Sequence, residues 1–153
     1  MLPGMKAALN LHPMFVHFPI VLWYSALFFE LLAVLRKSDG PHRTATWLLY
    51  LGTLAGIGTL FTGWNAENSV PPGAAMRIVG IHETLMVICT TLAAALCLFA
   101  FFARKNFTAV LRQLMLLGLF LLAIFVAIGA DRGAQMVYQY GVAVNWSTAN
   151  PQK

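Results

Sequence analysis

Charged side chains are scarce in this chain of 153 residues. They make up 10% of it and only five are acidic, against roughly 25% charged residues in typical soluble domains. Hydrophobic residues make up 59%. So little charge argues against a fold surrounded by water on every side, and it makes a lipid bilayer the expected solvent.

The chain also lacks the motifs of several functional classes. It has no glycine-rich phosphate loop, no Ser-His-Asp arrangement and no paired-cysteine metal motif. Its two cysteines, Cys89 and Cys97, share one apolar run and are too far apart along it to form a disulfide. Its net charge is +5, but the basic residues form short clusters between apolar runs rather than one polar surface, so we expect no nucleic-acid partner. We therefore expect a protein that is not an enzyme by itself.

What the sequence does contain is four long apolar runs, at residues 14–35, 46–64, 82–103 and 110–130. Each is close to the 20 or so residues that cross a hydrocarbon core about 30 Å thick. Short links predict an up-and-down order, and hence a single all-α domain, an integral membrane four-helix bundle. The tail, residues 131–153, mixes aromatic residues with glycine and glutamine and predicts an interfacial segment over the outer mouth of the bundle.

Basic residues indicate the orientation of the bundle. They cluster around the first link, at residues 36–43, and around the third link, at residues 104–112. The positive-inside rule places both links in the cytoplasm, so both termini face outward. We therefore expect a multi-pass protein of a bacterial inner (cytoplasmic) membrane with periplasmic termini.

Three histidines, His12, His17 and His82, gather at the predicted outer end. His17 lies about one turn inside the first run and His82 begins the third, so the two have similar depth. The first and third helices of such a bundle are diagonal, roughly 11–14 Å apart, which leaves room for two imidazoles to bind a haem iron between them. We therefore expect His17 and His82 to be axial ligands of haem b, with His12 as a weaker metal ligand.

Other interpretations of these histidines remain open. Neutral imidazoles near an interface also form hydrogen bonds with carbonyls or headgroups. All three together also suit a copper or zinc site, or a site of proton transfer.

A stripe of small residues follows one face of the second run: Gly52, Gly56, Thr59 and Gly63. At 100° per residue they fall within about 60° of one another. Such a stripe favours close helix packing, or else a cofactor face in which Gly56 and Gly63 lie against a porphyrin. Pro19, inside the first run, predicts a kink there because it has no N–H to donate.

Glu30 lies inside the first run, near its basic end. Its side chain is expected to reach the interface and pair with Arg36, Lys37 or Arg104, or to belong to a proton path. We expect His42, in the basic link, to be solvated.

Three residues near His82 have two interpretations each. Met86 and Cys89 suit the core or a soft metal, and Glu83 suits the orientation of an imidazole or contact with water.

Four segments together resemble a bacterial membrane family, the one called domain of unknown function 2231. They are the run LHPMFVHFPI at residues 11–20, the TGWNA sequence at 62–66, His82, and the tail from 133 to 144. The resemblance implies a four-helix membrane domain of unassigned activity, with members that look like b-type cytochromes and occur near redox proteins. Where the family tail has a histidine, this chain has Tyr140, which narrows the implied ligand pair to His17 and His82.

These observations lead to one main hypothesis and two alternatives. The main hypothesis is an electron-transfer subunit with one b-type haem near the outer face, between a quinone or other membrane partner and an outward-facing redox protein. The alternatives are a cofactor-free structural subunit of a larger respiratory or other membrane complex, and a protein that binds a transition metal at the outer face.

Overall fold

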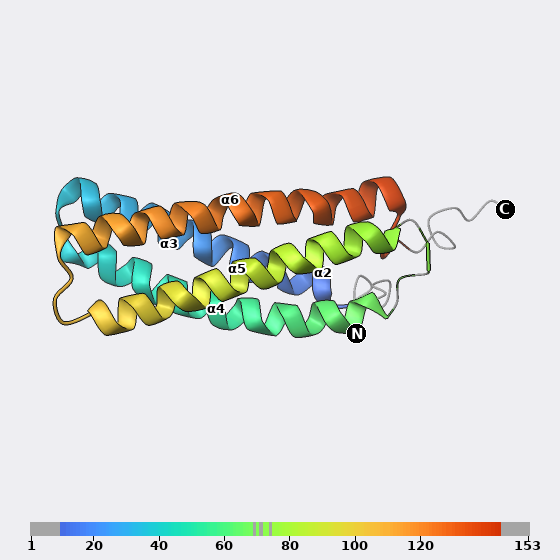
Figure 1. Cartoon of the computed structure of the whole chain (residues 1–153), viewed down its shortest axis with the longest axis horizontal. Helices are drawn as coiled ribbons and strands as arrows, with labels where there is room; N and C mark the ends of the chain where they lie inside the picture. Colours follow the sequence, from blue (N-terminus) through green and yellow to red (C-terminus); the bar gives the residue numbers. More distant parts are fainter. Residues whose placement is uncertain (1–9, 69, 71, 74, 145–153) are drawn as a thin grey trace.

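The computed structural model describes residues 10–68, 70, 72–73 and 75–144, and its regular structure in these ranges is entirely helical. The elements are α2 (His12–Phe15), α3 (His17–Arg36), α4 (Asp39–Glu67), α5 (Ala75–Ala103) and α6 (Ala109–Tyr140). The four long helices run side by side and reverse direction at each link (Figure 1). The predicted all-α, up-and-down four-helix architecture is therefore confirmed.

The four long helices form a square. α3 packs on α4 and α6, and α5 packs on the same two neighbours, whereas α3 and α5 share no close residue pairs in the described chain. The first and third long helices are thus diagonal, as predicted. We call the end where α2 begins and α6 ends the His12 end, and the opposite end the His42 end.

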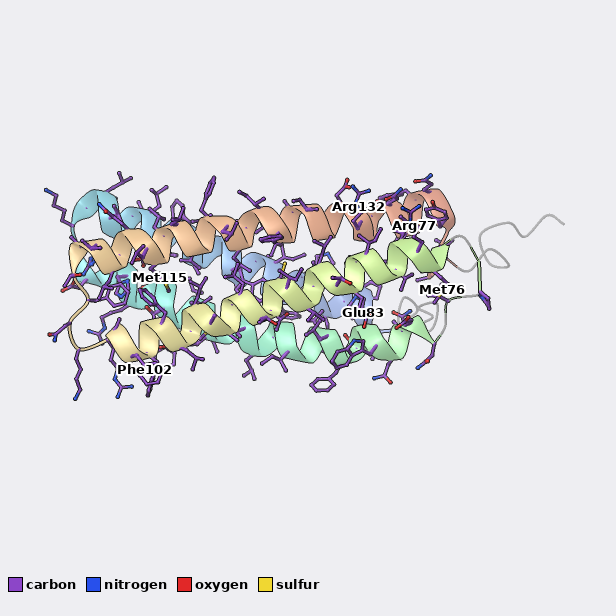
Figure 2. All side chains as sticks on the ribbon, viewed as in Figure 1. Met76, Arg77, Glu83, Phe102, Met115 and Arg132 are labelled. Atoms are coloured by element: carbon purple, nitrogen blue, oxygen red, sulfur yellow. The ribbon has the colours of Figure 1, made fainter. Side chains whose placement is uncertain are left out.

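All four spans are long and apolar enough to cross a membrane. They cover 25, 29, 29 and 32 residues, with α2 and α3 counted as one span. Large apolar side chains such as Phe28, Leu54 and Phe102 point away from the bundle, and nitrogen-tipped side chains gather toward its two ends (Figure 2). Lipid therefore surrounds the middle of the bundle.

Small residues and one large indole complete the core. A Cβ atom added to Gly52 or Gly56 would lie 2.7 or 2.8 Å from the Trp23 ring, so this ring fills the space that the two glycines leave. This part of the small-residue stripe serves helix packing. The predicted contact between Gly56 and a cofactor is corrected, because the Trp23 indole occupies that position.

Three helices extend beyond the predicted apolar runs. α4 begins at Asp39, α5 begins at Ala75 and α6 continues to Tyr140. Hydropathy marks only the part of a helix that lies in hydrocarbon, whereas backbone hydrogen bonds continue until a cap ends them. For α6 that cap is Gly141, in the left-handed conformation, with φ 66°. The predicted interfacial segment is corrected accordingly: residues 131–140 are the last turns of α6, and residues 145–153 lie outside the described ranges.

A break separates α2 from α3 at Val16. Pro19 has no N–H to donate to the Phe15 carbonyl, which is why the helix is interrupted here. The Thr59 hydroxyl of α4 donates to the Ala55 carbonyl of its own helix at 2.8 Å and lies 3.4 Å from the Phe15 carbonyl oxygen. The predicted kink is therefore present, and it lets the short α2 pack against α4.

Candidate functional site

His12 is the first residue of α2 and lies against the last turns of α4. Its backbone N–H donates to Asn10 Oδ1 at 3.2 Å, and its ring Nδ1 lies 3.1 Å from Thr62 Oγ1. A Cβ atom on Gly63 would lie 3.1 Å from Cε1 of the same ring. The imidazole is thus held between a hydroxyl group and a glycine.

The hydrogen bonds of Thr62 define which ring nitrogen of His12 carries the proton. The Thr62 hydroxyl donates its single hydrogen to the Thr59 carbonyl at 2.9 Å. When that hydrogen lies on the Thr59 carbonyl, the Thr62 oxygen accepts and Nδ1 of His12 is the donor. Nε2 of His12 then carries a free lone pair.

His82 is held in the same way on the other side of the bundle. Its Nδ1 lies 2.8 Å from the Gly129 carbonyl oxygen on α6. A carbonyl can only accept, so Nδ1 of His82 carries the hydrogen and Nε2 keeps its lone pair. A Cβ atom on Gly133 would lie 3.2 Å from Cε1 of this ring. A glycine therefore flanks each of the two imidazoles.

His12 and His82 lie at the same end of the bundle, and both are half-buried. One belongs to the α2–α4 side of the bundle and the other to the α5–α6 side. Metal-binding histidines are usually oriented by a hydrogen bond from the nitrogen that does not bind the metal. The His12 end thus holds two oriented imidazoles, each with an available Nε2 lone pair.

His17 does not join this pair. It is the first residue of α3, its side chain is exposed, and it forms no hydrogen bond with another side chain in the described part of the protein. The structure therefore brings His12, rather than the predicted His17, toward His82. Helical spacing in the sequence could have indicated this choice of His12. The inward face of the first span contains residues 12, 16, 19, 23, 26, 30 and 33, which recur every three or four positions. Residue 17 is not on this face.

The other residues predicted to act near His82 contact different groups. Glu83 accepts a hydrogen bond from Trp64 Nε1 at 2.7 Å, so it does not orient an imidazole. The Met86 methyl group packs against Gly129, and Cys89 is buried in the core. Among the residues that the structure describes, no three His, Cys, Asp or Glu side chains are grouped to hold a metal ion. The expected site made of His12, His17 and His82 is corrected, because His17 is exposed and the three are not grouped within the described residues.

A second polar pair lies at the His42 end. The Glu30 side chain is fully buried, and its Oε2 lies 2.7 Å from Nδ1 of His42. The His42 ring packs against Phe107, with 4.1 Å between ring centroids. Glu30 was expected to pair with a lysine or arginine, or to belong to a proton path, and His42 was expected to be solvated. The predictions of a basic partner and of a solvated His42 are wrong. Each residue lies on the inward face of its helix, where the two side chains meet.

A basic residue near this pair holds the turn between α3 and α4. Arg112 of α6 donates to the Ser38 carbonyl at 2.9 Å and to the carboxylate of Asp39. Since these acceptors engage its guanidinium, Arg112 does not take the place of His42 as the partner of Glu30.

Comparison with known protein families gives a match over residues 8–146, to the family described as predicted membrane protein (DUF2231). The chain belongs to this family. The match covers all four spans and both polar pairs, and it confirms the resemblance seen in the sequence. No curated protein and no solved structure matches the chain. Family membership therefore supports the membrane fold and assigns no activity.

Proposed function

We propose that this protein is a membrane electron-transfer subunit that binds one b-type haem at its His12 end, where His12 and His82 would hold it. The observation that carries the proposal is the shared orientation of the two rings. Each uses Nδ1 as a donor, to Thr62 or to Gly129, and each leaves the Nε2 lone pair free. Two neutral imidazoles in this state are what bis-histidine ligation of a haem iron requires.

Glycines and apolar side chains surround the two rings. Gly63 and Gly133 lie against the two imidazoles, where a larger side chain would displace them. Below them, Met86 and Leu85 pack on Gly129 and keep water away from the interior of the bundle. A haem, when bound, supplies reversible one-electron oxidation and reduction at its iron. The chain's own contribution is to orient the ligands and to provide apolar surroundings.

The position of the pair suggests where electrons enter and leave. The His12 end lies at one surface of the bilayer, so a soluble redox protein on that side can approach it, while a quinone or another membrane subunit supplies or removes electrons within the membrane. The basic links at residues 36–43 and 104–112 favour the cytoplasm for the opposite end. The electron-transfer site then faces the periplasm of a bacterial inner membrane.

The test is the reduced-minus-oxidised absorption spectrum of the protein purified from haem-replete cells. We expect a b-type spectrum that is lost in His12→Ala and in His82→Ala. His17→Ala is the matched control, because this exposed histidine lies at the same end and should leave the spectrum unchanged. A protein without b-type absorption, or one whose spectrum survives the loss of both His12 and His82, would overturn the proposal.

The same preparation separates the two alternatives. A cofactor-free structural subunit would co-purify with a larger complex and tolerate replacement of both histidines. A transition-metal protein would instead contain a stoichiometric metal other than haem iron.

A further inference from the structure

We propose that Glu30 and His42 form a proton-binding site, which takes up a proton from the water at the His42 end. This site lies at the opposite end of the bundle from His12 and His82, and the inference does not depend on a haem.

The first observation is the surroundings of the Glu30 carboxyl group. Its side chain is 0% exposed, although it lies in a helix that spans the membrane. Oε2 accepts a hydrogen bond from His42, whereas Oε1 has no partner. Because the side chain has no exposed surface, a proton that reaches or leaves Oε2 passes through its one hydrogen-bond partner, His42.

The second observation is the position of His42 between Glu30 and water. Its side chain is 12% exposed, so the ring reaches both the buried carboxyl group and the surface. Packing against Phe107 holds the ring in place. Nδ1 contacts Glu30, and Nε2 has no hydrogen-bond partner in the described ranges. His42 is thus placed to pass protons from water to Glu30.

The proton transfer balances in one simple step. A hydronium ion gives a proton to Nε2 of His42, and the Nδ1 proton moves to Oε2 of Glu30. The imidazole ends neutral, with its hydrogen on Nε2 instead of Nδ1, and the carboxylate becomes a carboxylic acid. The pair changes from a charge of −1 to zero, and the reverse step returns the proton to water.

Other charged groups at this end do not replace His42. Arg112 donates to Ser38 and Asp39, and the Arg104 guanidinium lies 4.0 Å from the centre of the Phe101 ring. Two further ionisable groups on the adjoining faces are Tyr50 and Cys97, and the Cys97 thiol donates to Thr53. The remaining charged side chains near these helix ends are exposed: Arg36, Lys37, Arg43 and Lys105. None of these groups forms a hydrogen bond with Glu30.

The small number of acidic residues makes a clean experiment possible. The chain has three glutamates, so a Glu67→Gln and Glu83→Gln double variant leaves Glu30 as its only one. In this variant, labelled with ¹³C at the glutamate carboxyl group and held in detergent micelles, a single carboxyl signal reports on Glu30. We expect that signal to change from carboxylate to carboxylic acid as pH falls, together with a change in the ¹⁵N signals of His42. A carboxylate signal throughout the pH range in which the protein stays folded would overturn the proposal.

A second variant tests the route through His42. In His42→Gln, added to the labelled double variant, Glu30 should exchange its proton with water much more slowly, which line shapes and exchange measurements detect. His17→Gln is the control, since it removes an exposed histidine from the other end. Equal exchange rates in the two variants would refute the role of His42. Should His42→Gln fail to fold, the titration of Glu30 beside an intact His42 still decides whether the pair binds a proton.

Discussion

The Cβ position at Gly63 lies 3.1 Å from Cε1 of His12. Gly133 and His82 are related in the same way, at 3.2 Å. A Cβ atom at either glycine would be closer to the ring than ordinary van der Waals contact allows. The position of each ring therefore depends on the absence of a side chain at the glycine.

Gly63→Ala and Gly133→Ala should therefore displace the neighbouring imidazole by a few tenths of an ångström. We expect less bound haem in protein from haem-replete cells, and altered ¹⁵N signals of the neighbouring histidine, because the ring must move. Gly58→Ala is the control, since nothing lies within 4 Å of its Cβ position. That variant should keep its bound haem and its histidine ¹⁵N signals. Its free energy of unfolding should rise by up to about 1 kcal/mol, because alanine has the higher helix propensity. Equal effects at all three positions would mean that the two ring contacts have no special role.

Thr62→Val should release the ring of His12. Valine has nearly the shape of threonine but cannot accept the hydrogen bond from Nδ1. The His12 ¹⁵N signals should then lose their preference for the Nδ1–H form, while those of His82 stay the same. Leaving this donor unsatisfied should cost about 1–3 kcal/mol of stability if the ring does not find water. The control is Thr84→Val, because the Thr84 hydroxyl donates to Gly80 in its own helix. If His12 keeps the Nδ1–H form in Thr62→Val, the Thr62 hydroxyl does not determine its tautomer.

Gly129→Ala should disturb the contact between α5 and α6. Its Cβ atom would lie 2.0 Å from the Met86 methyl group, so the methionine must move. We expect a loss of about 1–3 kcal/mol in the free energy of unfolding, measured by denaturation in mixed micelles. A double variant that also carries Met86→Ala should be less damaged than the sum of the two single variants, because the smaller side chain relieves the overlap. Strict additivity would show that the two residues do not compete for space. Gly80→Ala, which meets nothing within 4 Å, is the control.

Arg112 and Asp39 should contribute unequally to stability. The Arg112 side chain is 14% exposed and holds the Ser38 carbonyl, whereas the Asp39 side chain is 83% exposed. Arg112→Met should therefore cost about 1–3 kcal/mol, because the half-buried Ser38 carbonyl loses its donor. Asp39→Asn removes only a solvent-exposed charge and should cost less than about 1 kcal/mol. Thermal unfolding in detergent measures the stability of both variants. A larger loss of stability in Asp39→Asn than in Arg112→Met would contradict this prediction.

The sequence predicted the membrane fold because the relevant physics is local. Each apolar run is long enough to cross a bilayer, and a chain in hydrocarbon must satisfy its backbone hydrogen bonds internally, which leaves helices as the solution. Short links then impose the up-and-down order. The break near Pro19 was predictable for a similar reason, since it depends only on a missing N–H.

Helix ends were less predictable. α6 continues past its apolar run to Gly141, because polar residues remain helical once they leave the hydrocarbon. Hydropathy reports burial in lipid, and it does not report where the hydrogen-bonded backbone stops.

The partners of the polar residues were decided by the tertiary structure. Helical spacing in the first span already separates His12 and Glu30 from His17, but it does not tell which residue of another helix each one faces. That depends on the axial shift and rotation of packed helices, which the whole core determines together. The sequence by itself thus determined that this is a four-span membrane bundle with buried polar groups, and only the packing decided that His12 meets Thr62 and that Glu30 meets His42.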